Sequence, residues 1–120
     1  MRLILLGAGE FGLPTFRHLH QSHEVAAVVS QPDRPAGRKQ QLTPTPISAW
    51  ALDAGLPLHR WQDVNEATVI EALRALRADA AIVIAFGQKL SRPLLDALAP
   101  LTVNLHASLL PRWRGASPIN

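Results

Sequence analysis

Two polar side chains with the chemistry of an acyl-transfer site, Asn104 and His106, lie two residues apart at the end of an apolar run. Alternate residues of a strand point to the same face, so we expect both side chains to project together. A carboxamide NH₂ can stabilise an oxyanion, and an imidazole can move a proton near neutral pH. Neither is a good nucleophile alone. Direct acyl transfer between two bound substrates therefore fits better than a covalent intermediate.

The segment that follows this pair has the features of a ligand-binding turn. It offers backbone amides, one hydroxyl and two apolar side chains, from Ser108, Leu109, Leu110 and Pro111. Such a set suits a flat aromatic ligand with a polar edge. The remaining four histidines have no metal-ligand spacing, and the chain has no cysteine, so no metal site is expected.

The elements that must position these residues alternate between strand and helix patterns. Apolar runs predict strands at 2–6, 25–30, 56–61, 80–85 and 101–105. Helical patterns with suitable caps occupy 13–21, 46–54, 65–78 and 92–98, where Asn65 is the expected cap of the third. The proline-rich segment 31–45 is expected to be irregular. This order predicts an α/β fold with a Rossmann-like, doubly wound, mostly parallel sheet, whose ligands bind beyond the carboxyl ends of the strands.

Length and composition set the broad class. The chain has 120 residues, 48% of them hydrophobic, which allows one domain with a real core. No apolar run approaches the roughly 20 residues of a membrane helix. The opening apolar stretch is too short for a signal peptide, so we expect a cytoplasmic protein that does not contact membranes.

The turn Gly7-Ala8-Gly9-Glu10-Phe11-Gly12 favours a second interpretation. It has the G-x-G-x-x-G pattern after a strand and before a helix, and Asp33 follows about 20 residues later. An NAD(P)-binding module is therefore an alternative. Against it, Asp33 lies within a proline-rich segment, and Glu10 would repel a pyrophosphate. A tight turn that needs glycine only for its geometry explains the pattern equally well.

Ten of the twelve cationic residues are arginine, although the net charge is only +3. Arg34 and Arg38 lie in the proline-rich segment, and Arg112 lies near the C-terminal end of the chain. Clustered arginines suit phosphate groups, which the planar guanidinium holds with two hydrogen bonds. Charge alone favours an ordinary solvated surface over phosphate contact.

Two motifs together resemble a known family. Residues 104–119, Asn-Leu-His-Ala-Ser-Leu-Leu-Pro-Arg-Trp-Arg-Gly-Ala-Ser-Pro-Ile, resemble the core of the 10-formyltetrahydrofolate-dependent formyltransferases. Residues 31–38, Gln-Pro-Asp-Arg-Pro-Ala-Gly-Arg, resemble the branch that acts on methionyl-tRNA. The resemblance extends over the whole chain.

The resemblance implies a function for each candidate residue. Formyl transfer from 10-formyltetrahydrofolate to methionyl-initiator tRNA, for translation initiation, would use Asn104 for the oxyanion and His106 as the catalytic histidine. No metal is implied. The folate would be held by Ser108, Leu109, Leu110, Pro111, Phe86, Gly87, Gln88 and Leu90. The tRNA would be contacted by Arg34, Arg38 and Lys39.

The family pattern also differs from this sequence. The family usually has Gly-Thr-Pro-Glu-Phe where this chain has Gly7-Ala8-Gly9-Glu10-Phe11, and two lysines where Gln40 and Gln41 stand. The resemblance implies that 1–120 is a partial catalytic domain. The rest of that domain, its catalytic Asp and a C-terminal tRNA-binding domain would be absent, so the fragment alone would be inactive. A full-length form would be monomeric.

Two further alternatives remain open from sequence. One is another formyl-folate-dependent formyltransferase or hydrolase, because the motif after Asn104 is shared by relatives with other substrates. The other is a non-catalytic domain that binds folate or tRNA without turnover.

Overall fold

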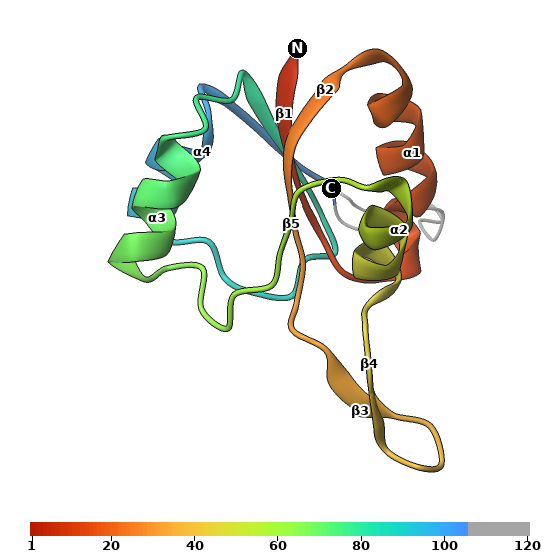
Figure 1. Cartoon of the computed structure of the whole chain (residues 1–120). Coiled ribbons are helices and arrows are strands. Elements are labelled where there is room, and N and C mark those ends of the chain that lie inside the picture. The colour runs from red at the N-terminus through yellow and green to blue at the C-terminus, as the bar shows by residue number, and fades with distance from the viewer. Residues whose placement is uncertain (106–120) are drawn as a thin grey trace, which may run out of the picture.

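A computed structural model describes residues 1–105, which form a five-stranded sheet with helices on both faces (Figure 1). The elements in chain order are β1 (Arg2–Gly7), the 3₁₀ helix η1 (Glu10–Gly12), α1 (Leu13–Ser22), β2 (Glu24–Val29), β3 (Arg34–Ala36), β4 (Gln41–Thr43), α2 (Pro46–Ala54), β5 (Leu58–His59), α3 (Ala67–Arg74), β6 (Ala80–Ile84), α4 (Arg92–Leu98) and β7 (Leu101–Leu105). The strand order in the sheet is β5-β2-β1-β6-β7, and every neighbouring pair is parallel. The predicted Rossmann-like, mostly parallel α/β fold is confirmed.

Both faces of the central strand β1 are covered by helices, and its side chains are accordingly apolar on both faces. Ile4 and Leu6 belong to the core that packs against α3 and α4, whereas Leu3 and Leu5 belong to the core on the α1 and α2 side. Figure 1 shows these helix pairs on opposite sides of the sheet. Alternation of side chains along β1 thus divides one apolar run between two cores.

The start and end of α2 follow from its local sequence. The Thr45 side chain accepts a hydrogen bond from the Ser48 N–H at 3.0 Å and caps the helix. Pro46 occupies the first turn, where its missing N–H costs nothing. Gly55 ends the helix in the left-handed region, at φ +71°. These predicted boundaries are confirmed.

The prediction of an irregular segment at 31–45 is wrong in its middle. β3 and β4 pair antiparallel there, with Pro35 opposite Leu42. Proline is tolerated because this is an isolated two-stranded hairpin, in which every strand has an open edge. The hairpin projects from the body of the protein (Figure 1). We call 31–44 the arm.

The predicted cap of the third helix is also wrong. α3 begins at Ala67 after Glu66 and ends at Arg74, so it is shorter than the expected 65–78. The Asn65 side chain instead bonds the backbone of Lys89 and Ser91. A distant loop therefore competes successfully with the helix end for this carboxamide.

Among residues 1–105, no helix has the length and apolar character required to cross a membrane.

The glycine turn after β1 is shaped by close packing at its first residue. A Cβ on Gly7 would lie 2.8 Å from the Ile84 carbonyl oxygen and 2.8 Å from Cε2 of Phe16. A Cβ on Gly9 would meet nothing within 4 Å. The two glycines of one motif are thus under different constraints.

We therefore expect Gly7→Ala to destabilise the fold by about 1–3 kcal/mol, because a backbone carbonyl and a buried ring must both move. Gly9→Ala is the matched control and should change the free energy of unfolding by less than about 0.5 kcal/mol. Urea denaturation of both variants measures the difference. Equal effects of the two substitutions would contradict this account of the turn.

Candidate functional site

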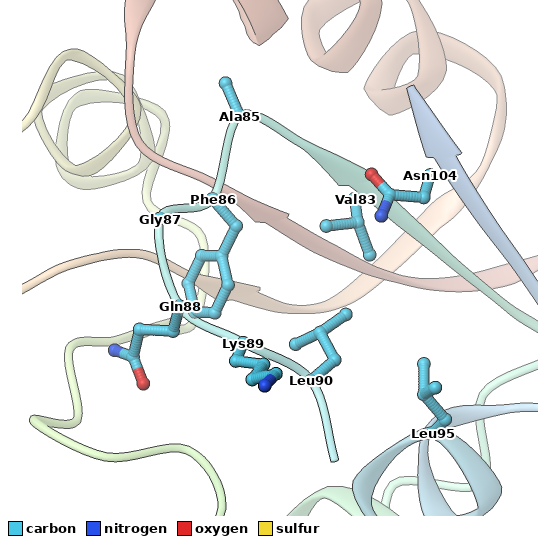
Figure 2. Close-up of a pocket in the computed structure, with 9 residues that line it drawn as sticks. All are labelled: Val83, Ala85, Phe86, Gly87, Gln88, Lys89, Leu90, Leu95 and Asn104. Carbon is cyan, nitrogen blue, oxygen red and sulfur yellow. The ribbon is translucent and has the colours of Figure 1, made fainter. Parts of the chain in front are cut away.

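A pocket lies beyond the carboxyl ends of β6 and β7, at the edge where ligands bind in this type of sheet. Its volume is about 400 Å³, within the usual range for small-molecule sites. Figure 2 shows its lining. The pocket is lined by Val83, Ala85, Phe86, Gly87, Gln88, Lys89, Leu90, Leu95 and Asn104. The pocket therefore brings Asn104 together with the four predicted folate-binding residues of the loop after β6, which are Phe86, Gly87, Gln88 and Leu90.

Asn104 reaches this pocket through the pairing of β7 with β6. Parallel register sets it beside Val83, one residue before the end of each strand. The residue is exposed, so its carboxamide is not committed to the core. An exposed amide at the mouth of a pocket is available to donate hydrogen bonds to a bound carbonyl or oxyanion.

The loop between β6 and α4 has an unusual backbone. Ala85 has φ +49° and Gly87 has φ +96°, so the chain turns twice through the left-handed region. The Ala85 carbonyl accepts a hydrogen bond from the Ala8 N–H at 3.1 Å, which fixes the start of the loop to the turn after β1. We call 86–90 the donor loop.

Some residues of the donor loop are bonded to other parts of the protein, and others only line the pocket. Phe86 is buried, and its carbonyl accepts a hydrogen bond from the Gln31 side chain at 3.0 Å. The Gln88 carboxamide is bonded to other segments and points away from Asn104 (Figure 2). Gly87 and Leu90 line the pocket, and within residues 1–105 no hydrogen bond to their backbone groups is seen.

Sequence reasoning missed some of the lining. Val83 and Leu95 supply apolar walls from β6 and α4. Val83 could have been found from its register with Asn104 had the strand pairing been assumed. Leu95 carries no signal of its own, because an apolar residue on a short helix is ordinarily assigned to the core.

The remaining predicted site residues belong to two other groups. Arg34 begins β3, and Arg38 and Lys39 lie in the turn between β3 and β4, all exposed. Among residues 1–105, none of these cations takes part in a salt bridge. His106 and the segment Ser108, Leu109, Leu110 and Pro111 lie outside the described residues.

The geometry of the glycine turn argues against a dinucleotide site. The Ala8 N–H donates to Ala85, and the Ala8 carbonyl accepts from the Ile47 N–H at 3.3 Å. Asp33 does not lie at the tip of β2 but forms an ion pair with Arg60 at 3.0 Å. Both the turn backbone and the acid expected at a ribose are thus engaged within the protein. The NAD(P) interpretation of the glycine motif is not favoured.

Across residues 1–105, no group of three or more His, Cys, Asp or Glu side chains is arranged to hold an ion.

The fold, the pocket and the carboxamide at its mouth can now be compared with those of known protein families. The model of the formyl transferase family matches residues 1–120, and the chain belongs to this family. The resemblance inferred from the two sequence motifs is confirmed.

Within the family, similar curated relatives carry the name methionyl-tRNA formyltransferase. The protein from Moorella thermoacetica is 48% identical over 121 residues, covering 100% of this chain and 39% of the relative. Those from Trichlorobacter lovleyi and Xanthomonas axonopodis pv. citri are 48% and 46% identical, each over 99% of this chain and 38% and 39% of the relative. The chain thus spans about two fifths of the length of the curated relatives it matches.

Next to the donor loop, the edge strand β5 carries a half-buried histidine. The rings of His59 and Trp61 are stacked, with centroids 4.6 Å apart and planes 5° from parallel. Burial lowers the pKa of His59 below its ordinary value of 6.5, because the imidazolium form is desolvated there.

This shift predicts a pH dependence of stability. Between the lowered pKa of His59 and 6.5, the unfolded state binds more protons at this residue than the folded state does. The contribution of neutral His59 to the free energy of unfolding is therefore fully present above pH 6.5 and decreases as the pH falls. His59→Gln should reduce the loss of unfolding free energy between about pH 7.5 and pH 5.5. His18→Gln on the exposed face of α1 is the control and should leave the loss unchanged. Identical pH profiles for His59→Gln and the unmodified protein would contradict the assignment.

Proposed function

We propose that the full-length protein transfers the formyl group of 10-formyltetrahydrofolate to the amino group of methionyl-initiator tRNA, in the cytoplasm and for translation initiation. The observation that carries this proposal is the pocket lined jointly by Asn104 and by the donor loop. Family membership supports the folate donor, and the names of the relatives support the tRNA acceptor.

The chemistry needs two bound substrates and no covalent enzyme intermediate. The amino nitrogen of methionine attacks the formyl carbon and forms a tetrahedral centre whose oxygen becomes negatively charged. The bond from that carbon to N10 of the folate then breaks, the nitrogen of the acceptor loses a proton, and N10 gains one. Formyl-methionyl-tRNA and tetrahydrofolate are released.

Each candidate residue has a place in this scheme. The Asn104 carboxamide donates hydrogen bonds to the developing oxyanion. His106 carries the proton between the two nitrogens. The apolar pocket walls and the backbone groups of the donor loop bind the folate ring, with Ser108–Pro111 as the second part of that site.

The arm supplies the contact to the acceptor. Its exposed cations Arg34, Arg38 and Lys39 face solvent on a hairpin that leaves the same edge of the sheet as the pocket. Phosphate groups are the ligands that such cations bind best. We assign the arm to the acceptor end of the tRNA.

Substitution of Asn104 tests the proposed chemistry. In the full-length protein, Asn104→Ala should lower kcat for formyl transfer about 10²–10³-fold with little change in either KM, because its hydrogen bonds act mainly on the transition state. Thr102→Ala is the control, since Thr102 lies on the same face of β7. Initial rates with labelled formyl donor measure both. A kcat for Asn104→Ala equal to that of Thr102→Ala would remove Asn104 from the mechanism.

Substitution in the arm tests the acceptor assignment. Arg38→Ala combined with Lys39→Ala should raise KM for methionyl-tRNA and leave the donor KM unchanged. It should also make the slope of log affinity against log salt shallower by about 1 for each phosphate that the arm no longer neutralises. Arg17→Ala, on exposed α1, is the control and should alter neither quantity. An unchanged salt slope in the double variant would exclude the arm as a phosphate-binding element.

A further inference from the structure

Two glutamine side chains form a continuous chain of hydrogen bonds behind the donor loop. The Val64 N–H donates to Oε1 of Gln88 at 2.9 Å, and Nε2 of Gln88 donates to Oε1 of Gln31 at 3.0 Å. Nε2 of Gln31 then donates to the Phe86 carbonyl at 3.0 Å. Nε2 of Gln88 also donates to the Trp61 carbonyl at 3.1 Å. Each carboxamide has its oxygen toward a donor and its nitrogen toward an acceptor, so the network fixes both orientations.

The network is buried enough for its disruption to matter. Gln31 is only 9% exposed, and a buried amide without a partner is costly. Gly87 is adapted to the same contact, because a Cβ there would lie 2.6 Å from Nε2 of Gln31. Glycine at 87 therefore serves both the left-handed backbone and the space that the Gln31 carboxamide occupies.

A second carboxamide holds the other end of the same loop. Nδ2 of Asn65 donates to the Lys89 carbonyl at 2.9 Å, and Oδ1 accepts from the Ser91 N–H at 2.9 Å. The donor loop has no helix or strand of its own. Its conformation is thus imposed by side chains that arrive from segments far away in the sequence.

Gln31 also stands at the base of the arm. The hydroxyls of Ser30 and Thr45 lie 2.6 Å apart and join the two ends of the arm. Asp33 is held by Arg60. The first residue of the arm thus reaches into the donor loop from a base that other contacts keep in place.

We propose that Gln31 and Gln88 are positioning residues that hold the donor loop in the conformation that binds the formyl donor. Gln31 bonds the Phe86 carbonyl directly, and Gln88, itself in the loop, ties Gln31 to the backbone of Val64 and Trp61. The loop is thereby held in the shape in which Gly87 and Leu90 line the pocket. The identity of the ligand as a folate rests on the proposed function above. The role in ordering the loop does not.

The test uses the full-length protein with Gln31→Met, Gln88→Met and the double variant. Methionine keeps the length of the side chain and removes its hydrogen bonds. Each single variant removes two or three hydrogen bonds of the network and should raise the Kd for a folate analogue and the donor KM about tenfold, with KM for tRNA unchanged. The double variant should show a smaller effect than the product of the two single effects, because both residues belong to one chain of bonds. Hydrogen exchange of the 86–91 amides should accelerate in all three.

Ser30→Ala is the matched control, because Ser30 is also buried and also bonded at the base of the arm, but its hydroxyl bonds Thr45 and not the donor loop. It should leave the donor KM and the exchange of 86–91 unchanged. Unchanged exchange and donor affinity in both glutamine variants would overturn the inference, and so would equal changes in Ser30→Ala. If the unmodified protein binds no folate analogue, the proposed function fails, and the exchange of 86–91 in the variants against the control still decides whether the glutamines order the loop.

Discussion

The pairing of β6 with β1 on one side and with β7 on the other is the constraint on which the site depends. Ala80–Ile84 pairs in register with Leu3–Gly7 and with Leu101–Leu105. Because the three strands are parallel, their carboxyl ends meet at one edge, where the donor loop and Asn104 open into the same pocket. A slip of one residue in β7 would turn Asn104 to the opposite face and separate it from that loop.

The sheet places the donor loop, and polar side chains then determine its shape. Main-chain groups of an irregular loop need partners, and here the side chains of Gln31 and Asn65 supply them in place of a strand or a helix, while Gln88 joins the loop to Gln31, Trp61 and Val64. Such hydrogen-bonded amides contribute less to stability than an apolar core of the same size, but they accept only one geometry. A loop that must present particular backbone groups to a ligand benefits more from that selectivity than from additional apolar contact.

Local patterns were sufficient for the parts of the fold that local interactions determine. The apolar runs of β1 and β6 and the boundaries of α2 could be predicted because burial on two faces and end-capping leave signals within a few residues. Two features could not be predicted in this way. The hairpin of β3 and β4 forms despite its proline, and Asn65 bonds a distant loop and does not cap α3. Asn104 was found in advance from its polar side chain at the end of an apolar strand, and the donor loop through the family resemblance. The Gln31–Gln88 contact joins residues 57 apart and has no local signal.

The two proposed binding surfaces depend on different forces, and the fold keeps them apart. A hairpin of three residue pairs has marginal stability by itself, so the position of the arm depends on the contacts at its base. The exposed tip of the arm can then interact with a partner through charge. Attraction between exposed cations and phosphate weakens with salt over a Debye length of about 8 Å at physiological ionic strength. Burial of an aromatic ring in an apolar pocket does not weaken in this way. Gln31 belongs to the base of the arm and also contacts the donor loop, so the contacts that hold the base, Ser30 with Thr45 and Asp33 with Arg60, lie between the charged tip and the pocket.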